Sequence, residues 1–142
     1  MALTRADTFT GSKKQIEYFS DFMTSFAKTP VGNQLARVTN EHAVMQSLKN
    51  LIRTNLGERL FQPTVGSDVM ATLFELNTDE ARDSLELFIN NTVENNEPRV
   101  NLLQTIVNTD GINENQIEIT LIYNLINNPT ELTLNLVLKR VR

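Results

Sequence analysis

Residues 117–126 read IEITLIYNLI, and a large apolar side chain occupies every second position. An alternation with a period of two places one set of side chains on one face of an extended chain, so this stretch predicts a β-strand with one buried face. The alternating positions are Ile117, Ile119, Leu121, Tyr123 and Leu125.

The flanking stretches repeat this pattern. Residues 132–139 alternate leucine with other side chains, and residues 100–107 are rich in β-branched and apolar types. Turn-forming residues separate the three stretches, at 108–111 and at 127–129. Short connections between alternating strands predict an antiparallel meander of three strands. The leucines of the last strand are Leu132, Leu134, Leu136 and Leu138.

Helical patterns precede the strands. Apolar residues recur with helical spacing at 40–56 and 78–96, and a shorter helix is expected after Ser67, whereas Pro63 and two glycines predict a loop at 57–66. We therefore expect an α+β fold in which the N-terminal arm and the helices pack on one face of the small sheet. Residues 1–39 are interpreted as an N-terminal arm with an aromatic segment, and residues 40–142 as a single α+β domain.

Composition excludes several classes of function. The 142 residues contain no cysteine and one histidine, which excludes disulfides, thiolate zinc sites and multi-histidine metal sites. The formal net charge of −4 argues against nucleic-acid binding. The chain has no apolar run long enough to span a membrane and no secretory signal, so we expect it to be made in the cytoplasm. No cofactor is expected.

Catalytic patterns are weak. The glycines are too far apart for a phosphate-binding loop or a dinucleotide fingerprint, and no nucleophile elbow is found. His42 is interpreted as a surface or partly packed histidine. Glycoside hydrolysis needs two carboxyl groups, but the 17 acidic residues are scattered, and a small domain offers little cleft. We predict that the chain is not an enzyme; the acids weighed were Glu58, Asp68, Glu75 and Glu97.

Two short segments are candidate binding elements. Tyr18, Phe19 and Phe22 are aromatic residues in a polar segment, and they either pack on the domain itself or anchor in a neighbouring protein. Glu97-Pro98-Arg99 either stops a helix with two solvated charges, or presents a carboxylate and a guanidinium on one side of the chain. Such a pair would dock a partner or lock the fold.

An ordered series of motifs carries a resemblance to a known family. Residues 47–66 fit the pattern SLKNLIxTxxGERxFxPxxG and lead into Leu73-Phe74-Glu75, followed by a helix, Glu97-Pro98-Arg99 and the strand meander. Over residues 40–142 this series resembles the sheath-initiator family of contractile tails. The family includes baseplate wedge subunits of T-even-like phages and a baseplate component of type VI secretion systems.

The resemblance implies a structural subunit of a virion tail baseplate that starts assembly of the contractile sheath. It implies wedge proteins, the tail sheath protein and tube-proximal baseplate proteins as partners, with Glu97, Pro98 and Arg99 contacting the wedge core bundle. It also implies that the sheet offers strands to the first ring of sheath subunits. We place this pairing on the strand with Leu132, Leu134, Leu136 and Leu138, because an exposed sheet edge can template another strand.

Three classes of function stay open from the sequence: the sheath initiator, a cell-wall hydrolase, and a small adaptor on the same fold. The initiator binds stoichiometric partners without turnover. The hydrolase would lose lytic activity when one acid becomes an amide. The adaptor would bind one soluble partner without an open sheet edge.

Overall fold

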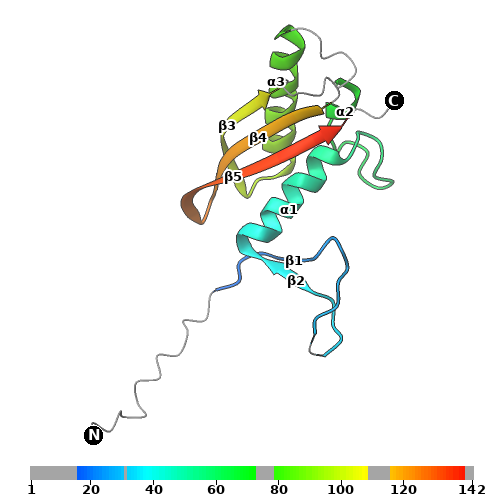
Figure 1. Cartoon of the computed structure of the whole chain (residues 1–142), viewed down its shortest axis with the longest axis vertical. Coiled ribbons are helices and arrows are strands. Elements are labelled where there is room, and N and C mark those ends of the chain that lie inside the picture. Colours follow the sequence, from blue (N-terminus) through cyan, green and yellow to red (C-terminus); the bar gives the residue numbers. More distant parts are fainter. Residues whose placement is uncertain (1–15, 31, 73–78, 109–115, 140–142) are drawn as a thin grey trace, which may run out of the picture.

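The computed structural model describes residues 16–30, 32–72, 79–108 and 116–139 (Figure 1). The described elements, in chain order, are β1 (Ser20–Phe22), β2 (Arg37–Thr39), α1 (Asn40–Arg53), α2 (Val69–Thr72), α3 (Asp79–Asn96), β3 (Val100–Asn108), β4 (Gln116–Leu125) and β5 (Asn128–Lys139).

The three C-terminal strands form an antiparallel sheet in the order β3-β4-β5, which confirms the predicted meander and the α+β class. The turn between β4 and β5 lies at residues 126–127, one position earlier than predicted, because Leu125 pairs with Asn128. Pro129 therefore lies inside β5, where an edge strand tolerates a residue without an N–H. The predicted turn after Asn108 falls largely outside the described residues.

The helices bury their apolar faces against the sheet. The core joins α1, through Val44, Leu48 and Ile52, to α3 and the inner face of the sheet. From α3 come Leu85, Ile89 and Val93. The sheet contributes Ile119, Leu121, Tyr123, Leu134, Leu136 and Leu138, among others. Among the apolar residues at helical spacing in 78–96, Leu85, Ile89 and Val93 lie in the core, whereas Phe88 is exposed.

Helix α1 ends at Arg53, earlier than the predicted residue 56. The Thr54 N–H still bonds to the Asn50 carbonyl at 3.0 Å, but the Thr54 carbonyl accepts the Ser67 N–H at 2.8 Å. That contact draws the chain into an extended path, and Ser67 donates its hydroxyl to the Ile52 carbonyl instead of capping the next helix. The predicted apolar positions Leu73 and Phe74 lie outside the described residues.

Residues 16–39 do not lie on the face of the sheet, which corrects the expected position of this part of the chain. β1 and β2 pair antiparallel, with Ser20 opposite Thr39, in a two-stranded sheet at the N-terminal end of α1 (Figure 1). Asn40 ties this segment down: its side-chain oxygen accepts the Tyr18 N–H at 2.9 Å, and its amide donates to the Ile16 carbonyl at 3.0 Å. Residues 1–15 of the predicted arm lie outside the described residues.

Candidate partner-binding surfaces

Glu97, Pro98 and Arg99 form a β-turn between α3 and β3. The Val100 N–H donates to the Glu97 carbonyl at 3.2 Å, and proline is well suited to the second position of such a turn. The segment was expected to be extended. The turn differs from that extended geometry, yet it also brings the Glu97 and Arg99 side chains to the same side of the chain.

The Glu97 carboxylate lies at the centre of a small polar network. It accepts hydrogen bonds from the Arg99 guanidinium, at 2.5 and 2.7 Å, and from the Ser47 hydroxyl of α1 at 2.7 Å. Arg99 also donates to the Ser47 hydroxyl at 3.1 Å and stacks over the Phe19 ring, 5.4 Å from its centroid. The network therefore joins three distant parts of the chain.

Burial divides this motif into two parts. Glu97 is only 3% exposed, whereas Arg99 is partly exposed and Pro98 is exposed. Burial alone would raise the pKa of Glu97, but the hydrogen bonds from Arg99 and Ser47 outweigh it and hold the pKa below 4.5. The bond to Glu97 in turn raises the pKa of Arg99. Glu97 thus locks α1 to the sheet, and only Pro98 and Arg99 offer surface to a partner.

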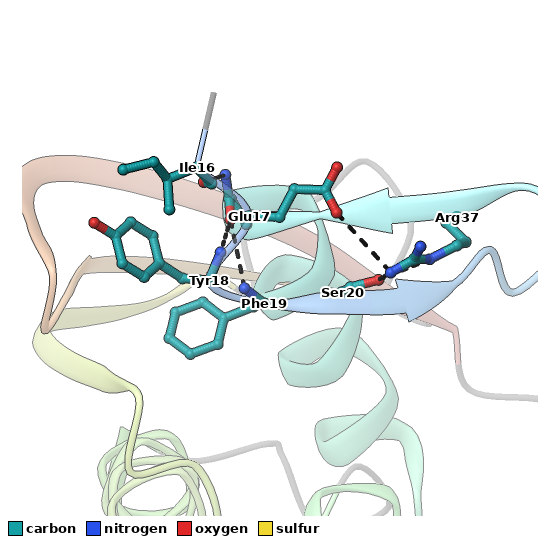
Figure 2. A network of polar contacts seen from close by, with 7 residues as sticks. Ile16, Glu17, Tyr18, Phe19, Ser20 and Arg37 are labelled. Carbon is teal, nitrogen blue, oxygen red and sulfur yellow. Dashed lines mark hydrogen bonds and ion pairs between the residues drawn. The ribbon is translucent and has the colours of Figure 1, made fainter. Parts of the chain in front are cut away.

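The three aromatic residues of the N-terminal segment also differ in burial. Phe19 is partly buried and packs against the core, so for this residue the intramolecular interpretation holds. Tyr18 and Phe22 are exposed. Figure 2 shows the Glu17 side chain reaching toward Arg37, whereas the Tyr18 ring points away from that pair. Two of the three predicted anchors are therefore available to a neighbour.

The leucines of β5 do not themselves face a partner. Leu134, Leu136 and Leu138 are buried in the core, and Leu132 packs against it. What β5 does offer is its outer edge, because within the described chain it pairs with β4 alone. From Leu132 to Lys139 that pairing is regular, so the edge is a continuous row of backbone donors and acceptors.

A groove of about 750 Å³ lies between α1, the β1–β2 segment and β5. Side chains at helical spacing along α1 form one wall, and residues 133–135 of β5 form another. The apolar lining comes from Met23, Val38, Met45 and Leu134, and the charged lining from Lys49 and Arg53, with His42 beside them. Among the residues that the structure describes, no carboxylate lines this groove. Its chemistry fits an extended segment that carries apolar and acidic side chains.

Sequence reasoning did not identify this groove. Apart from Met45, the α1 wall consists of polar-face positions that helical periodicity assigns to solvent. A detectable signal was the recurrence of cations on that face, at Lys49 and Arg53, with no acid between them. The β5 wall of the groove could not be predicted from the sequence, because no local pattern shows that β5 lies beside α1.

The carboxylates weighed for catalysis do not converge in the described part of the chain. Glu97 is bound by Arg99, and the Glu58 carboxylate accepts the Asn55 N–H of its own loop at 2.9 Å. Asp68 is exposed next to α2, and Glu75 lies outside the described residues. Among the described residues, no cluster of three potential metal ligands is found, and no helix is long and apolar enough to cross a membrane.

Comparison with known proteins identifies a family and several similar solved structures. The sequence model of a family described as baseplate wedge protein gp25 matches residues 38–130. No curated protein matches the chain. A Geobacter sulfurreducens protein described as a candidate tail lysozyme has a TM-score of 0.66 at 20% identity, over 72% of this chain and 92% of that one.

Two baseplate assemblies contain a similar chain. A chain of the anti-feeding prophage baseplate gives a TM-score of 0.61 at 21% identity, over 87% of each chain. A chain of the type VI secretion system baseplate complex gives 0.56 at 15% identity, over 71% of this chain and 93% of that one. At these identities the likeness establishes a shared fold.

Proposed function

Since the chain belongs to the baseplate wedge protein gp25 family of structural baseplate components, we propose that it initiates the sheath of a contractile phage tail. It docks on the wedge core bundle and offers the edge of β5 to a strand of the tail sheath protein. It acts in the tail baseplate of the virion, is assembled in the host cytoplasm, and contacts wedge, sheath and tube-proximal baseplate proteins.

The observation that carries this proposal is the open β5 edge beside a cationic groove. A strand that pairs with β5 gains backbone hydrogen bonds, and its alternate side chains enter the groove along α1. Basic side chains at the rim select an acidic segment and speed its association. The other sheet edge is less suitable, because the pairing of β3 shifts register between Leu102 and Gln104.

The wedge proteins are assigned to the Glu97-Pro98-Arg99 turn, on the side of α1 that carries Ser47. Pro98 and Arg99 are accessible there, and the exposed Tyr18 and Phe22 rings belong to the segment that packs against Arg99 through Phe19. Rigid aromatic rings next to a partly desolvated arginine are the residue types that most often dominate binding energy at interfaces. Glu97 contributes by holding Arg99 in place.

A structural role without catalysis fits the site chemistry better than hydrolysis. Glu97, the most buried of the candidate acids that the structure describes, is ionised and paired with Arg99, whereas a general acid needs a raised pKa. One structurally similar protein is described as a candidate tail lysozyme, but a shared fold does not transfer an activity.

Sheath binding is tested with the purified sheath protein encoded in the same genome. Lys49→Glu reverses one exposed charge in the groove, and we expect the affinity to fall about 3- to 10-fold, mainly through slower association. Lys28→Glu makes the same change outside the groove and should leave the affinity unchanged. Equal weakening by both variants would indicate non-specific electrostatics and reject the groove.

Wedge docking is tested by capture of co-expressed wedge proteins. Pro98→Lys places a long charged side chain on the exposed turn without touching the buried Glu97 carboxylate, and it should abolish capture. Asp83→Lys on the exposed face of α3 is the control and should retain it. A native chain that binds one soluble protein but neither wedge nor sheath proteins would instead support the adaptor function.

A further inference from the structure

The loop after α1 presents the two most exposed large apolar side chains of the described chain. Leu60 is 91% exposed and Phe61 is 97% exposed, and we call this pair the loop tip. The loop leaves the end of α1 that is opposite the β1–β2 segment (Figure 1). A phenylalanine in this position contributes almost nothing to the domain's own core, so its exposure calls for another explanation.

The loop that carries the tip is held in one conformation. The Gly57 N–H donates to the Pro63 carbonyl at 2.8 Å, which closes the base of the tip. At the root, Ser67 bonds to Thr54, and Gly66 packs so closely on Asn55 that a Cβ there would lie 2.8 Å from backbone atoms. A pre-organised loop loses little conformational entropy when it binds, which favours its use as an anchor.

The loop that carries the tip meets the groove at the end of α1. The α1 wall of the groove ends at Arg53, and the loop begins with the next residue. A protein whose extended segment lies along β5 and α1 therefore meets the loop as it leaves the groove. Arg59, next to the tip, is exposed and contacts Gln62 at 3.5 Å, so this end of the loop carries one cation beside Glu58.

From this continuity we infer that Leu60 and Phe61 insert into an apolar pocket on the same partner that supplies the acidic segment to the groove. The inference rests on the proposed function, which makes the sheath protein that partner. It adds a second contact, formed by side chains instead of backbone, next to the strand pairing. Two linked contacts with one partner bind more tightly than either alone.

The test uses the intact chain and the purified sheath protein from the same genome. We expect the Leu60→Ser, Phe61→Ser double variant to bind about 30-fold or more weakly, as the loss of a buried aromatic anchor does. Its thermal unfolding should match the native chain, because both side chains of the tip are almost fully exposed in the described part of the chain. Leu87→Ser, at an exposed leucine of α3, is the matched control and should bind as the native chain does.

The outcomes separate this inference from the proposed function. If the native chain binds the sheath protein and the double variant binds equally well, the anchor is rejected and the proposed function stands. If the native chain does not bind at all, both are rejected. Phe61→p-benzoylphenylalanine identifies the occupant by photocross-linking: a cross-link to apolar residues of the sheath protein is expected. A cross-link to a wedge protein or to a second copy of this chain would overturn the assignment.

Discussion

Replacing Arg99 with alanine tests whether the buried ion pair locks α1 to the sheet. The change would leave the Glu97 carboxylate, which is 3% exposed, with the Ser47 hydroxyl as its remaining side-chain hydrogen-bond donor. Removing one partner of a buried pair typically costs about 3 to 5 kcal/mol, because the other charge is left uncompensated.

The exposure of Arg99 lowers this figure. Its side chain is 36% exposed, so water already screens part of the interaction in the native protein and can reach the carboxylate in the variant. The lost stacking on Phe19 adds about 0.5 to 1 kcal/mol. We therefore expect Arg99→Ala to lower the free energy of unfolding by about 2 to 3 kcal/mol and the Tm by about 5 to 10 °C.

Urea denaturation at neutral pH, followed by circular dichroism, measures this change. Arg59→Ala, at an exposed arginine outside the core, should change stability by less than about 0.5 kcal/mol. Adding Glu97→Gln to Arg99→Ala should recover about 1 kcal/mol, because the buried charge disappears with its partner. If Arg99→Ala stays within about 0.5 kcal/mol of the native chain, the pair does not lock the fold and the reasoning is refuted.

Three further predictions concern stability. The pKa of Glu97 is lowered on folding, so the stability that its ionised carboxylate contributes is complete above pH 4.5 and is lost as the pH falls below that value. The difference in the free energy of unfolding between the native chain and Arg99→Ala should therefore shrink in acid. A constant difference would contradict this. Gly66→Ala should lower the free energy of unfolding by about 3 kcal/mol or more, because the new Cβ would lie 2.8 Å from the Asn55 backbone. Gly57→Ala has open space around it but a φ of +81°, and it should cost about 1 to 2 kcal/mol. Equal costs would disprove the steric argument. Tyr123→Phe should match or exceed native stability, since the buried Tyr123 hydroxyl has no hydrogen-bond partner among the described residues, and a loss above about 1 kcal/mol would indicate an unseen partner.

The sheet and the main helices follow from local patterns in the sequence. The alternation that ends in Tyr123 and Leu125 identifies β4, because one face of the strand is buried and the other is not. The helical stripe through Val44, Leu48 and Ile52 identifies α1 for the same reason, with the period of a helix. In both elements the residues that the spacing places on one face are the ones that are buried, so periodicity alone predicts the element.

The site depends on contacts that local patterns cannot show. Glu97 meets Ser47 across 50 positions of sequence, and nothing near either residue indicates the other. The strands β1 and β2 have three residues each, too few for a period, and they are held by the side chain of Asn40. The groove exists because the fold brings β5 beside α1. These features depend on contacts between residues that are far apart in the sequence, so no local pattern predicts them.

Hydrogen exchange of the β5 amides measures whether a strand of the sheath protein pairs with the edge of β5. The intact chain is labelled alone and with saturating sheath protein from the same genome, and exchange is followed by mass spectrometry over residues 131–139. An added strand bonds to the outward N–H groups of the edge, so we expect slower exchange in β5 and in the Lys49 to Arg53 turn of α1. Binding that leaves exchange in β5 unchanged would contradict the account, because the sheath protein would then dock elsewhere.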